Sequence, residues 1–346
     1  MNKNKKKPRT YLGLFIVLWG GQFMVGPLEA MSITTVYPAL LFIPINSSWL
    51  LMPLFFLYVQ RTSIFANNKT GYWLLIPGII SFLLQLFCFL LPVSKKIQLK
   101  DSNVIPAFWF ASIIYALIVS AYIIYYISLH KKEITNQYSS TDHKKLNWAC
   151  YFVIFLSIPI LILIKRNFIE DSVNMELFFS CYTVLLMYWL SIQGLRQTQI
   201  MTLMPVENPV NSTKLFSRPK NKLSKNDVDQ GLKDIVNELN TYLKSSQLYL
   251  NKDLTISEIA EYLKIHPKRI STAINNVTNQ NFNSYINKFR IEKALELMNG
   301  VHLRNYSIEG IGEEVGFNSK SAFYSSFKKN TGTTPSNYMG KPTGKG

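Results

Sequence analysis

The sequence predicts an all-α chain made of two unlike parts, a polytopic transmembrane helical bundle and a following cytoplasmic all-helical domain. Six long runs without a charged residue occupy most of the first 195 residues. Three prolines and several basic residues mark the segment that follows, and beyond it apolar residues recur at helical spacing, with one pattern returning 52 positions later. We therefore expect a transmembrane region at 1–196, a flexible basic linker at 197–224 and a second domain at 225–342.

Charge and cysteine usage narrow the class of protein. The formal net charge is +17, but residues 225–346 contribute only +4 of it, so charge alone does not identify a partner for the second domain. Cys88, Cys150 and Cys181 lie in apolar runs, and no Cys/His spacing typical of a metal site or a disulfide framework is present. We expect buried free thiols, no metal and no cofactor.

The first part of the chain opens with a basic segment, Lys3 to Arg9, directly ahead of the first apolar run. No small-x-small cleavage site follows, so we interpret this run as a retained span and not as a cleaved signal peptide. A bilayer core about 30 Å thick needs about 20 apolar residues, and the runs meet or approach this length. The predicted spans are 11–28, 36–60, 72–94, 104–129, 146–164 and 177–195.

The second run is the weakest, because Pro38, Pro44 and the polar residues 46–48 interrupt it and favour an interfacial position for its first part. A soluble helical bundle is the alternative to a membrane bundle, but it needs polar outer faces that these runs lack. With the N-terminus inside, 12 flanking Lys and Arg residues fall on the cytoplasmic side and 5 outside. An even number of spans then returns the second domain to the cytoplasm.

The linker at 197–224 combines prolines with Asn, Ser, Thr and Lys, a composition typical of a flexible or partly extended tether. Its cations, such as Lys214 and Lys220, could contact anionic lipid headgroups or nucleic-acid phosphate. A simply solvated linker is the other interpretation.

The last quarter of the chain contains two helical hairpins, at 256–278 and 308–330. The apolar positions that repeat after 52 residues are Ile256, Ile259, Ala260 and Leu263 in the first copy and Ile308, Ile311, Gly312 and Val315 in the second. Each first helix is followed by a short break and a helix-start signal, Pro267 in one copy and Asn318 with Ser319 in the other. Helix, tight turn and helix is the unit that places its second helix in the DNA major groove.

Two further helices complete the second domain. Residues 228–244 place Leu232, Ile235, Val236, Leu239 and Leu243 on one face. Residues 282–298 form a long linker helix between the hairpins.

The second hairpin carries a family resemblance. Residues 316–319, Phe323, 327–329, Gly332 and 334–338 resemble the signature of AraC/XylS-family transcription regulators, and residues 290–294 and 254–263 resemble that family's linker helix and first motif. The resemblance covers roughly residues 235 to 340. It implies a seven-helix domain with two helix-turn-helix motifs, double-stranded DNA binding and transcriptional control.

Two features qualify or extend this resemblance. The first motif departs from the pattern, with Lys264 where a turn glycine is common and His266 with Pro267 in place of a serine-led cap. Residues 53–59, 146–148 and 194–197 of the multi-span region are similar to N-terminal regions that some bacterial proteins join to this domain, a resemblance that implies a bacterial cytoplasmic (inner) membrane.

The outer face of each second helix supplies the candidate DNA contacts, because Ile270 and Ile274 point inward in one and Phe323 and Phe327 in the other. Lys can contact guanine, and Ser or Thr can hydrogen-bond either base type. We expect base contacts from Lys268, Ser271, Thr272, Lys320, Ser321 and Ser325. For the two lysines, contact with DNA phosphate is an alternative of equal weight. We expect backbone contacts, which position the protein, from Arg269, Lys288, Arg290, Tyr324, Lys328 and Lys329.

The sequence thus predicts a membrane-anchored regulator, with no enzymatic activity, that couples an envelope or membrane signal to gene expression. Its expected partners are double-stranded DNA and the lipid bilayer, with a homodimer and RNA polymerase as further candidates; the sensed ligand, the operator and the sign of regulation are not identified. A membrane carrier or enzyme with a regulatory DNA-binding tail is the alternative, and it predicts a polar cluster within the spans. Tethering without sensing is a third interpretation.

Overall fold

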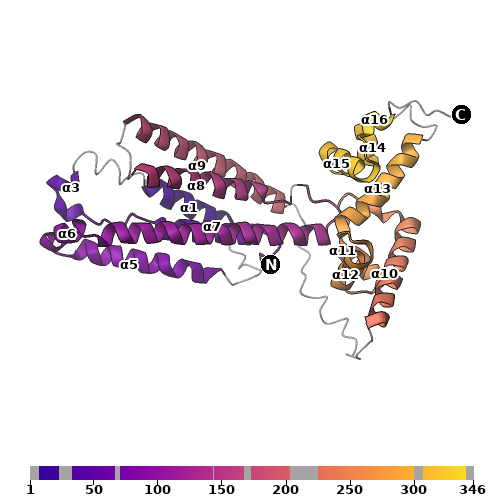
Figure 1. The fold of residues 1–346 in the computed structure, drawn as a ribbon, viewed down its shortest axis with the longest axis horizontal. Coiled ribbons are helices and arrows are strands. Elements are labelled where there is room, and N and C mark those ends of the chain that lie inside the picture. The colour runs from indigo at the N-terminus through magenta and orange to yellow at the C-terminus, as the bar shows by residue number, and fades with distance from the viewer. Residues whose placement is uncertain are drawn as a thin grey trace. The chain divides into compact units, whose positions relative to one another are not determined.

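The computed structural model describes residues 8–22, 33–66, 71–142, 144–166, 173–202, 225–299 and 307–339. Within these ranges the regular elements are helices, as the sequence predicts, apart from one antiparallel bridge between Tyr138 and Thr255. The chain divides into two compact units, Met1–His130 with Leu146–Met204, and Lys131–Lys145 with Pro205–Gly346 (Figure 1).

The first unit is a helical bundle. Its longer helices are α1 (Pro8–Gln22), α4 (Ser48–Thr62), α5 (Ile76–Leu90), α7 (Val104–Gln137), α8 (Asn147–Arg166) and α9 (Val173–Thr202). Short elements lie between them: α3 (Ile33–Val36), η1 (Pro38–Leu40), η2 (Tyr72–Leu75) and α6 (Val93–Lys100). Helix α4 is buried from Met52 to Gln60 and contacts α1, α5 and α9, so it forms the centre of this unit.

Aromatic rings fill the core around α4. Phe15 of α1, Phe55 of α4 and Phe152 of α8 have ring centroids 4.7 to 5.9 Å apart. Phe56, on another side of α4, packs 5.1 Å from Tyr122 and other rings of α7. Aromatic pairs at these distances add about 0.5–1.5 kcal/mol each beyond their area burial. The aromatic-rich runs therefore account for the packing of this bundle.

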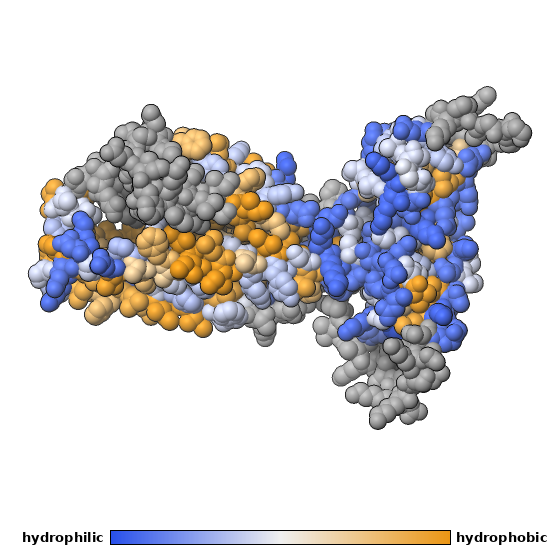
Figure 2. Space-filling view, in the orientation of Figure 1, coloured by the Kyte–Doolittle hydropathy of each residue, from blue (hydrophilic) through white to orange (hydrophobic). Residues whose placement is uncertain are grey.

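The outward faces of α5 and α7 are strongly apolar, and the space-filling view shows orange side chains gathered over this unit (Figure 2). Phe87 and Leu90 of α5 are 62% and 74% exposed, and Ile118 of α7 is 62% exposed. Among the described residues, two helical segments are long and apolar enough to cross a membrane, Tyr72–Leu90 and Val104–Gln137. These segments overlap two of the six predicted spans, 72–94 and 104–129.

The helices differ in length from several predicted spans. The run 36–60 is not one helix, because α3, η1 and a non-helical stretch precede the 15-residue α4. Pro38 and Pro44 account for the break, since proline lacks the amide hydrogen that a continuous helix needs. The run 72–94 ends as a helix at Leu90, ahead of Pro92, whereas α7 continues eight residues past the predicted end at residue 129. Residues 23–28 of the first predicted span lie outside the described residues.

A small set of polar contacts lies within the bundle, where the carrier or enzyme alternative predicts a polar cluster. Arg61 donates to the Tyr72 hydroxyl at 2.9 Å, and that hydroxyl lies 2.7 Å from the hydroxyl of Tyr11. Nδ1 of His130 accepts from the backbone amide of Ile64 at 3.1 Å. These bonds pair polar groups that would otherwise be buried without partners, which is a structural role.

The second unit contains seven α-helices in its described residues, the number that the family resemblance implies. They are α10 (Lys225–Ser246), α11 (Ile256–Leu263), α12 (Pro267–Thr278), α13 (Phe282–Asn299), α14 (Ile308–Glu314), α15 (Lys320–Thr331) and α16 (Pro335–Met339), with a short η4 (Leu248–Leu250). Residues 203–224, most of the predicted linker, lie outside the described residues, whereas 197–202 belong to α9.

Helix α13 joins two separate cores. Its first half contributes Phe282, Tyr285, Ile286 and Phe289 to the core under α10, α11 and α12. Its second half contributes Ile291, Ala294 and Met298 to the core under α14 and α15. The prediction that 228–244 buries one apolar face is confirmed, because Leu239 and Leu243 are fully buried. Each hairpin therefore has its own core, and one helix spans both.

Candidate DNA-binding interface

The first hairpin is built by a side-chain cap and a left-handed turn. The Thr255 hydroxyl accepts from the amide of Glu258 and starts α11. Lys264 ends that helix with φ of 54°, and the next amide, that of Ile265, donates to the Ala260 carbonyl at 3.1 Å. A side chain in this region of φ is strained by about 1–2 kcal/mol, which is why glycine is common there. Lys264 nevertheless adopts the turn that a glycine would make.

The second hairpin repeats these devices 52 residues later. The Ser307 hydroxyl caps α14 by accepting from Gly310, and Phe317 donates to the Gly312 carbonyl at 2.9 Å. Gly316 occupies the position of Lys264, with φ of 91°. A Cβ at Gly316 would lie 2.5 Å from the carbonyl oxygen of Leu250, so this turn admits no side chain.

The second helix of each hairpin crosses the first at a small residue. A Cβ at Gly312 would lie 2.9 Å from the ring of Phe323, which is tighter than real contacts allow. Ala260, its equivalent, is 4% exposed. A residue without a side chain at position 312 therefore permits the close crossing in the second hairpin.

Helices α12 and α15 each bury one face and expose the other. Ile270 and Ile274 of α12 are fully buried, as is Phe327 of α15, with Phe323 at 1% exposed. This confirms the inward residues that the sequence predicts. Burial of large apolar side chains fixes the rotation of each helix, because truncating one of them costs about 2–5 kcal/mol. The opposite faces are thereby held outward.

The predicted base-contacting residues fall on these outward faces. Lys268, Thr272, Lys320, Ser321 and Ser325 are exposed, and Ser271 is half-buried. Three hydroxyls already bond within their own helices: Thr272 donates to the Lys268 carbonyl and Ser325 to the Ala322 carbonyl, while the Ser271 hydroxyl accepts from Asn275. A base contact at these positions would replace or share such a bond.

An ion pair distinguishes Lys320 from its counterpart Lys268. The Lys320 ammonium lies 2.5 Å from the Glu309 carboxylate, and this contact raises the pKa of Lys320 and lowers that of Glu309. Ser257 stands at the position equivalent to Glu309, so the first copy has no carboxylate at that position. Both partners are exposed, so water and salt screen the pair. The sequence does not predict this contact, although aligning the two copies at their offset of 52 positions reveals the difference in charge between Glu309 and Ser257.

The predicted backbone-contacting residues divide into two groups. Arg269, Lys288, Lys328 and Lys329 are exposed, and Tyr324 is half-buried. Arg290 is 1% exposed, and its guanidinium donates to the carbonyls of Tyr249 at 2.6 Å and Asn251 at 2.7 Å. Arg290 therefore belongs to the structural core and not to the expected phosphate contacts, because a buried guanidinium with these partners cannot reach a duplex.

Burial lowers the pKa of Arg290 to about 10, and the nearby Asp253 opposes that shift in part. A pKa of about 10 leaves the guanidinium charged at neutral pH. Its charge then strengthens the hydrogen bonds to carbonyls from the segment between α10 and α11, since charge-assisted bonds are roughly twice as strong as neutral ones. Arg290 thus ties α13 to the start of the first hairpin.

The remaining chemistry of the described residues is not that of a metal site. No group of three or more His, Cys, Asp or Glu side chains is placed to hold a metal ion within the described ranges. Cys88 and Cys150 are half-buried and Cys181 is exposed, and the structure pairs none of these three in a disulfide. The prediction that all three are buried is therefore wrong, because Cys181 lies on an outward face of α9 and the other two are only half-buried.

Comparison with known proteins supports the class of the second domain. Residues 249–341 match a family model described as a helix-turn-helix domain, which supports an AraC-type DNA-binding region and a role in transcription regulation. The match covers the two hairpins and the helix between them. No curated protein and no solved structure is significantly similar to the chain.

Proposed function

We propose that this chain is a membrane-anchored transcription regulator that reads specific DNA sequences with α12 and α15. The observation that carries the proposal is the repeated hairpin, in which each second helix buries an apolar face and presents cations and hydroxyls on the other. Helices of this kind, held in one rigid domain, enter successive major-groove faces about one helical turn apart.

The six base-facing candidates and the exposed backbone candidates have different roles in this proposal. Lys320 and Ser325, with their counterparts on α12, select the sequence through base edges. Lys328, Lys329, Arg269 and Lys288 contact phosphates and set the register of the domain on the duplex. The few arginines on the outward faces leave room for a contribution from DNA shape.

Membrane anchoring is the second component of the proposal, and it is supported by the exposed apolar faces of α5 and α7 in the first unit. Monomeric soluble proteins rarely expose contiguous apolar patches larger than a few hundred Å², so such faces call for lipid or another apolar cover. Both helices lack charged residues over the apolar stretches 76–90 and 104–129. We propose that the bundle holds the chain in the bacterial inner membrane and passes an envelope signal to the DNA-binding domain.

The DNA-reading roles are tested by comparing two kinds of variant in the full chain reconstituted in lipid nanodiscs. Lys320→Ala or Ser325→Ala should reduce affinity for the selected sequence by about 1–3 kcal/mol per lost base contact, with little change on random duplex. Lys328→Ala should weaken binding to both duplexes alike and reduce the slope of log affinity against log salt by about 1. Equal losses for both kinds of variant on both duplexes would exclude the base-reading roles.

The anchoring component has its own test. The intact chain should stay with the membrane fraction after a high-salt wash and an alkaline wash, which remove peripheral proteins. Release into the soluble fraction would contradict the anchor without affecting the DNA-binding component.

A further inference from the structure

The second unit includes a segment that does not come from the C-terminal domain. Residues 138–145, between α7 and α8, belong to the same compact unit as the two hairpins. We call the described residues 138–142, 144 and 145 the docking loop. Ser139 is 1% exposed, and Ser140 and Thr141 are 7% and 8% exposed, so the loop is packed into the domain.

One side of the docking loop contacts the first hairpin and α13. Tyr138 forms the antiparallel bridge with Thr255, and the Ser139 amide donates to the Leu254 carbonyl at 2.9 Å. Arg290 donates to the Ser139 hydroxyl at 3.0 Å, and Asn283 donates to the Ser139 carbonyl at 2.6 Å. The buried guanidinium therefore holds the loop as well as the domain.

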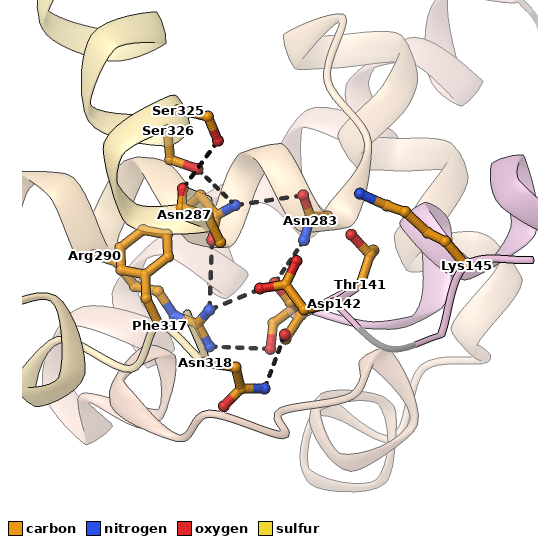
Figure 3. A pocket seen from close by; sticks show the side chains of 13 residues that line it. Thr141, Asp142, Lys145, Asn283, Asn287, Arg290, Phe317, Asn318, Ser325 and Ser326 are labelled. Carbon is orange, nitrogen blue, oxygen red and sulfur yellow. Dashed lines mark hydrogen bonds between the residues drawn. The ribbon is translucent and has the colours of Figure 1, made fainter. Parts of the chain in front are cut away.

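The other side of the docking loop contacts the start of α15 (Figure 3). Asn318 donates to the Ser140 hydroxyl at 2.9 Å, and the Ser319 hydroxyl donates to the Asp142 carboxylate at 2.5 Å. Ser319 is the residue that caps α15, since its hydroxyl also accepts from Ala322. The loop thus places a carboxylate at the amino end of the second DNA-reading helix.

A polar pocket lies beside this contact. Its lining includes Asp142 of the loop, Asn287 of α13 and Ser325 and Ser326 of α15 (Figure 3). Ser325 is one of the residues that we propose to contact bases. The loop therefore lies next to the surface that a duplex would have to approach.

The chemistry of this end of α15 favours one anion at a time. A helix amino end attracts negative charge, through its free amides and its dipole, and phosphate groups of nucleic acids use the same feature. With Asp142 bound to the capping serine, a DNA phosphate approaching that turn meets a like charge and an occupied hydroxyl. Like charges brought together at an interface oppose association.

We propose that the docking loop occupies the DNA-facing end of the second hairpin and must leave before α15 can bind DNA. This inference rests on the proposed DNA-binding function. The loop is continuous with α7 at Gln137 and α8 at Asn147, so the partner that masks the hairpin is part of the bundle's own chain. A signal that changes those helices would then alter DNA binding by docking or releasing the loop.

The size of the effect follows from the docked fraction. The apparent dissociation constant equals the intrinsic one divided by the fraction of protein that is competent to bind. If the loop is docked in about nine molecules of ten, apparent affinity falls about tenfold. A protein whose loop is held in place by a covalent bond should show a larger fall in apparent affinity for DNA than this tenfold.

A disulfide that locks the loop tests the inference in the full chain. Cys88, Cys150 and Cys181 are replaced by Ser, and Ser140→Cys is combined with Asn318→Cys, the pair whose side chains now hydrogen-bond. The protein is reconstituted in nanodiscs of phosphatidylethanolamine and phosphatidylglycerol, oxidised, and titrated with a duplex selected by the reduced protein. We expect the cross-link to form, affinity to fall at least about tenfold, and reductant to restore it; each single-Cys variant should be unaffected by oxidation.

The outcomes separate this inference from the proposed function. If the reduced protein binds no duplex, the DNA-binding proposal fails. If the reduced protein binds and the cross-linked protein binds equally or more tightly, the loop is no obstacle and the inference is overturned. Failure of the cross-link to form would overturn the docked arrangement itself.

A charge-removing variant gives a second readout without cysteines. Asp142→Asn should tighten DNA binding several-fold, because it weakens the contact with Ser319 and removes the competing charge. Glu133→Gln is the matched control, since Glu133 lies on α7 in the same unit and accepts a hydrogen bond from Gln137, one helical turn away. Equal effects of the two variants would show a general charge effect and would count against the docking contact.

Discussion

The two hairpins share one design but differ in what surrounds their second helices. In both, a side-chain hydroxyl caps the first helix and a residue with positive φ makes the turn. The amide of the residue after that turn donates to the carbonyl five positions earlier. In the second hairpin, Glu309 pairs with Lys320 and Asp142 binds Ser319. In the first, Ser257 replaces Glu309, and Pro267 stands where Ser319 would align. Similar backbones thus carry unequal electrostatic environments, because in the described residues two carboxylates contact the start of α15 at positions that have no acidic counterpart in the first copy.

The largest expected effect comes from breaking the link between α13 and the start of the first hairpin. Arg290→Ala should lower the free energy of unfolding by roughly 3 kcal/mol or more, because carbonyls of Tyr249 and Asn251 lose a charged donor in a buried site. Lys288→Ala, an exposed change on the same helix, should stay within about 0.5 kcal/mol. Denaturant unfolding of the full chain in detergent, monitored through the loss of helix content, measures the free energy of unfolding of both variants. Equal stabilities of the two variants would contradict the structural role of Arg290.

The turns of the two hairpins should respond in opposite directions. Gly316→Ala should destabilise by about 2 kcal/mol or more, since it adds the left-handed penalty of about 1–2 kcal/mol to a clash with the Leu250 carbonyl. Lys264→Gly should be neutral or stabilising by up to about 1 kcal/mol, because it relieves the same strain in the first copy. Thermal unfolding of both variants makes the comparison, and the same sign at both positions would show that the turns are not equivalent.

The smallest effect concerns the ion pair between Glu309 and Lys320 in the second hairpin. Glu309→Gln should strengthen DNA binding slightly, because it frees Lys320 from an exposed, solvent-screened ion pair. The gain should shrink as salt rises, since exposed pairs are screened. Ser257→Glu, which creates the missing carboxylate in the first copy, should weaken binding by a similar amount. Salt-dependent titrations with one duplex decide whether either change has the expected sign.

Much of the second domain could be predicted from its sequence because its signals are local. The spacing of Ile256, Ile259 and their copies fixes amphipathic helices, and Phe323 with Phe327 fixes which face of α15 is buried. The turn at Lys264 follows from its alignment with Gly316. These features depend on residues within one or two helical turns of each other, so periodicity and capping reveal them.

The parts that could not be predicted depend on contacts across long stretches of chain. The positive charge of Arg290 predicts a contact with a DNA phosphate, but its guanidinium is buried and donates to carbonyls about 40 residues earlier in the chain. The docking of Ser139 and Asp142 joins segments more than 140 residues apart, and no local pattern marks it. The predicted span 36–60 is longer than the helix α4 that the structure contains, because the prolines within the run set the helix start more strongly than the absence of charge does.

The most direct measurement of the central claim is a hydroxyl-radical footprint of the full chain on a duplex selected from a random pool. Two reading helices in one domain should protect two stretches about one helical turn apart on the same face of the DNA. Lys268→Ala should weaken protection mainly at one stretch and Lys320→Ala mainly at the other, and rising salt should weaken both. A single protected stretch that neither change alters, or the absence of salt-dependent protection, would contradict DNA reading by α12 and α15.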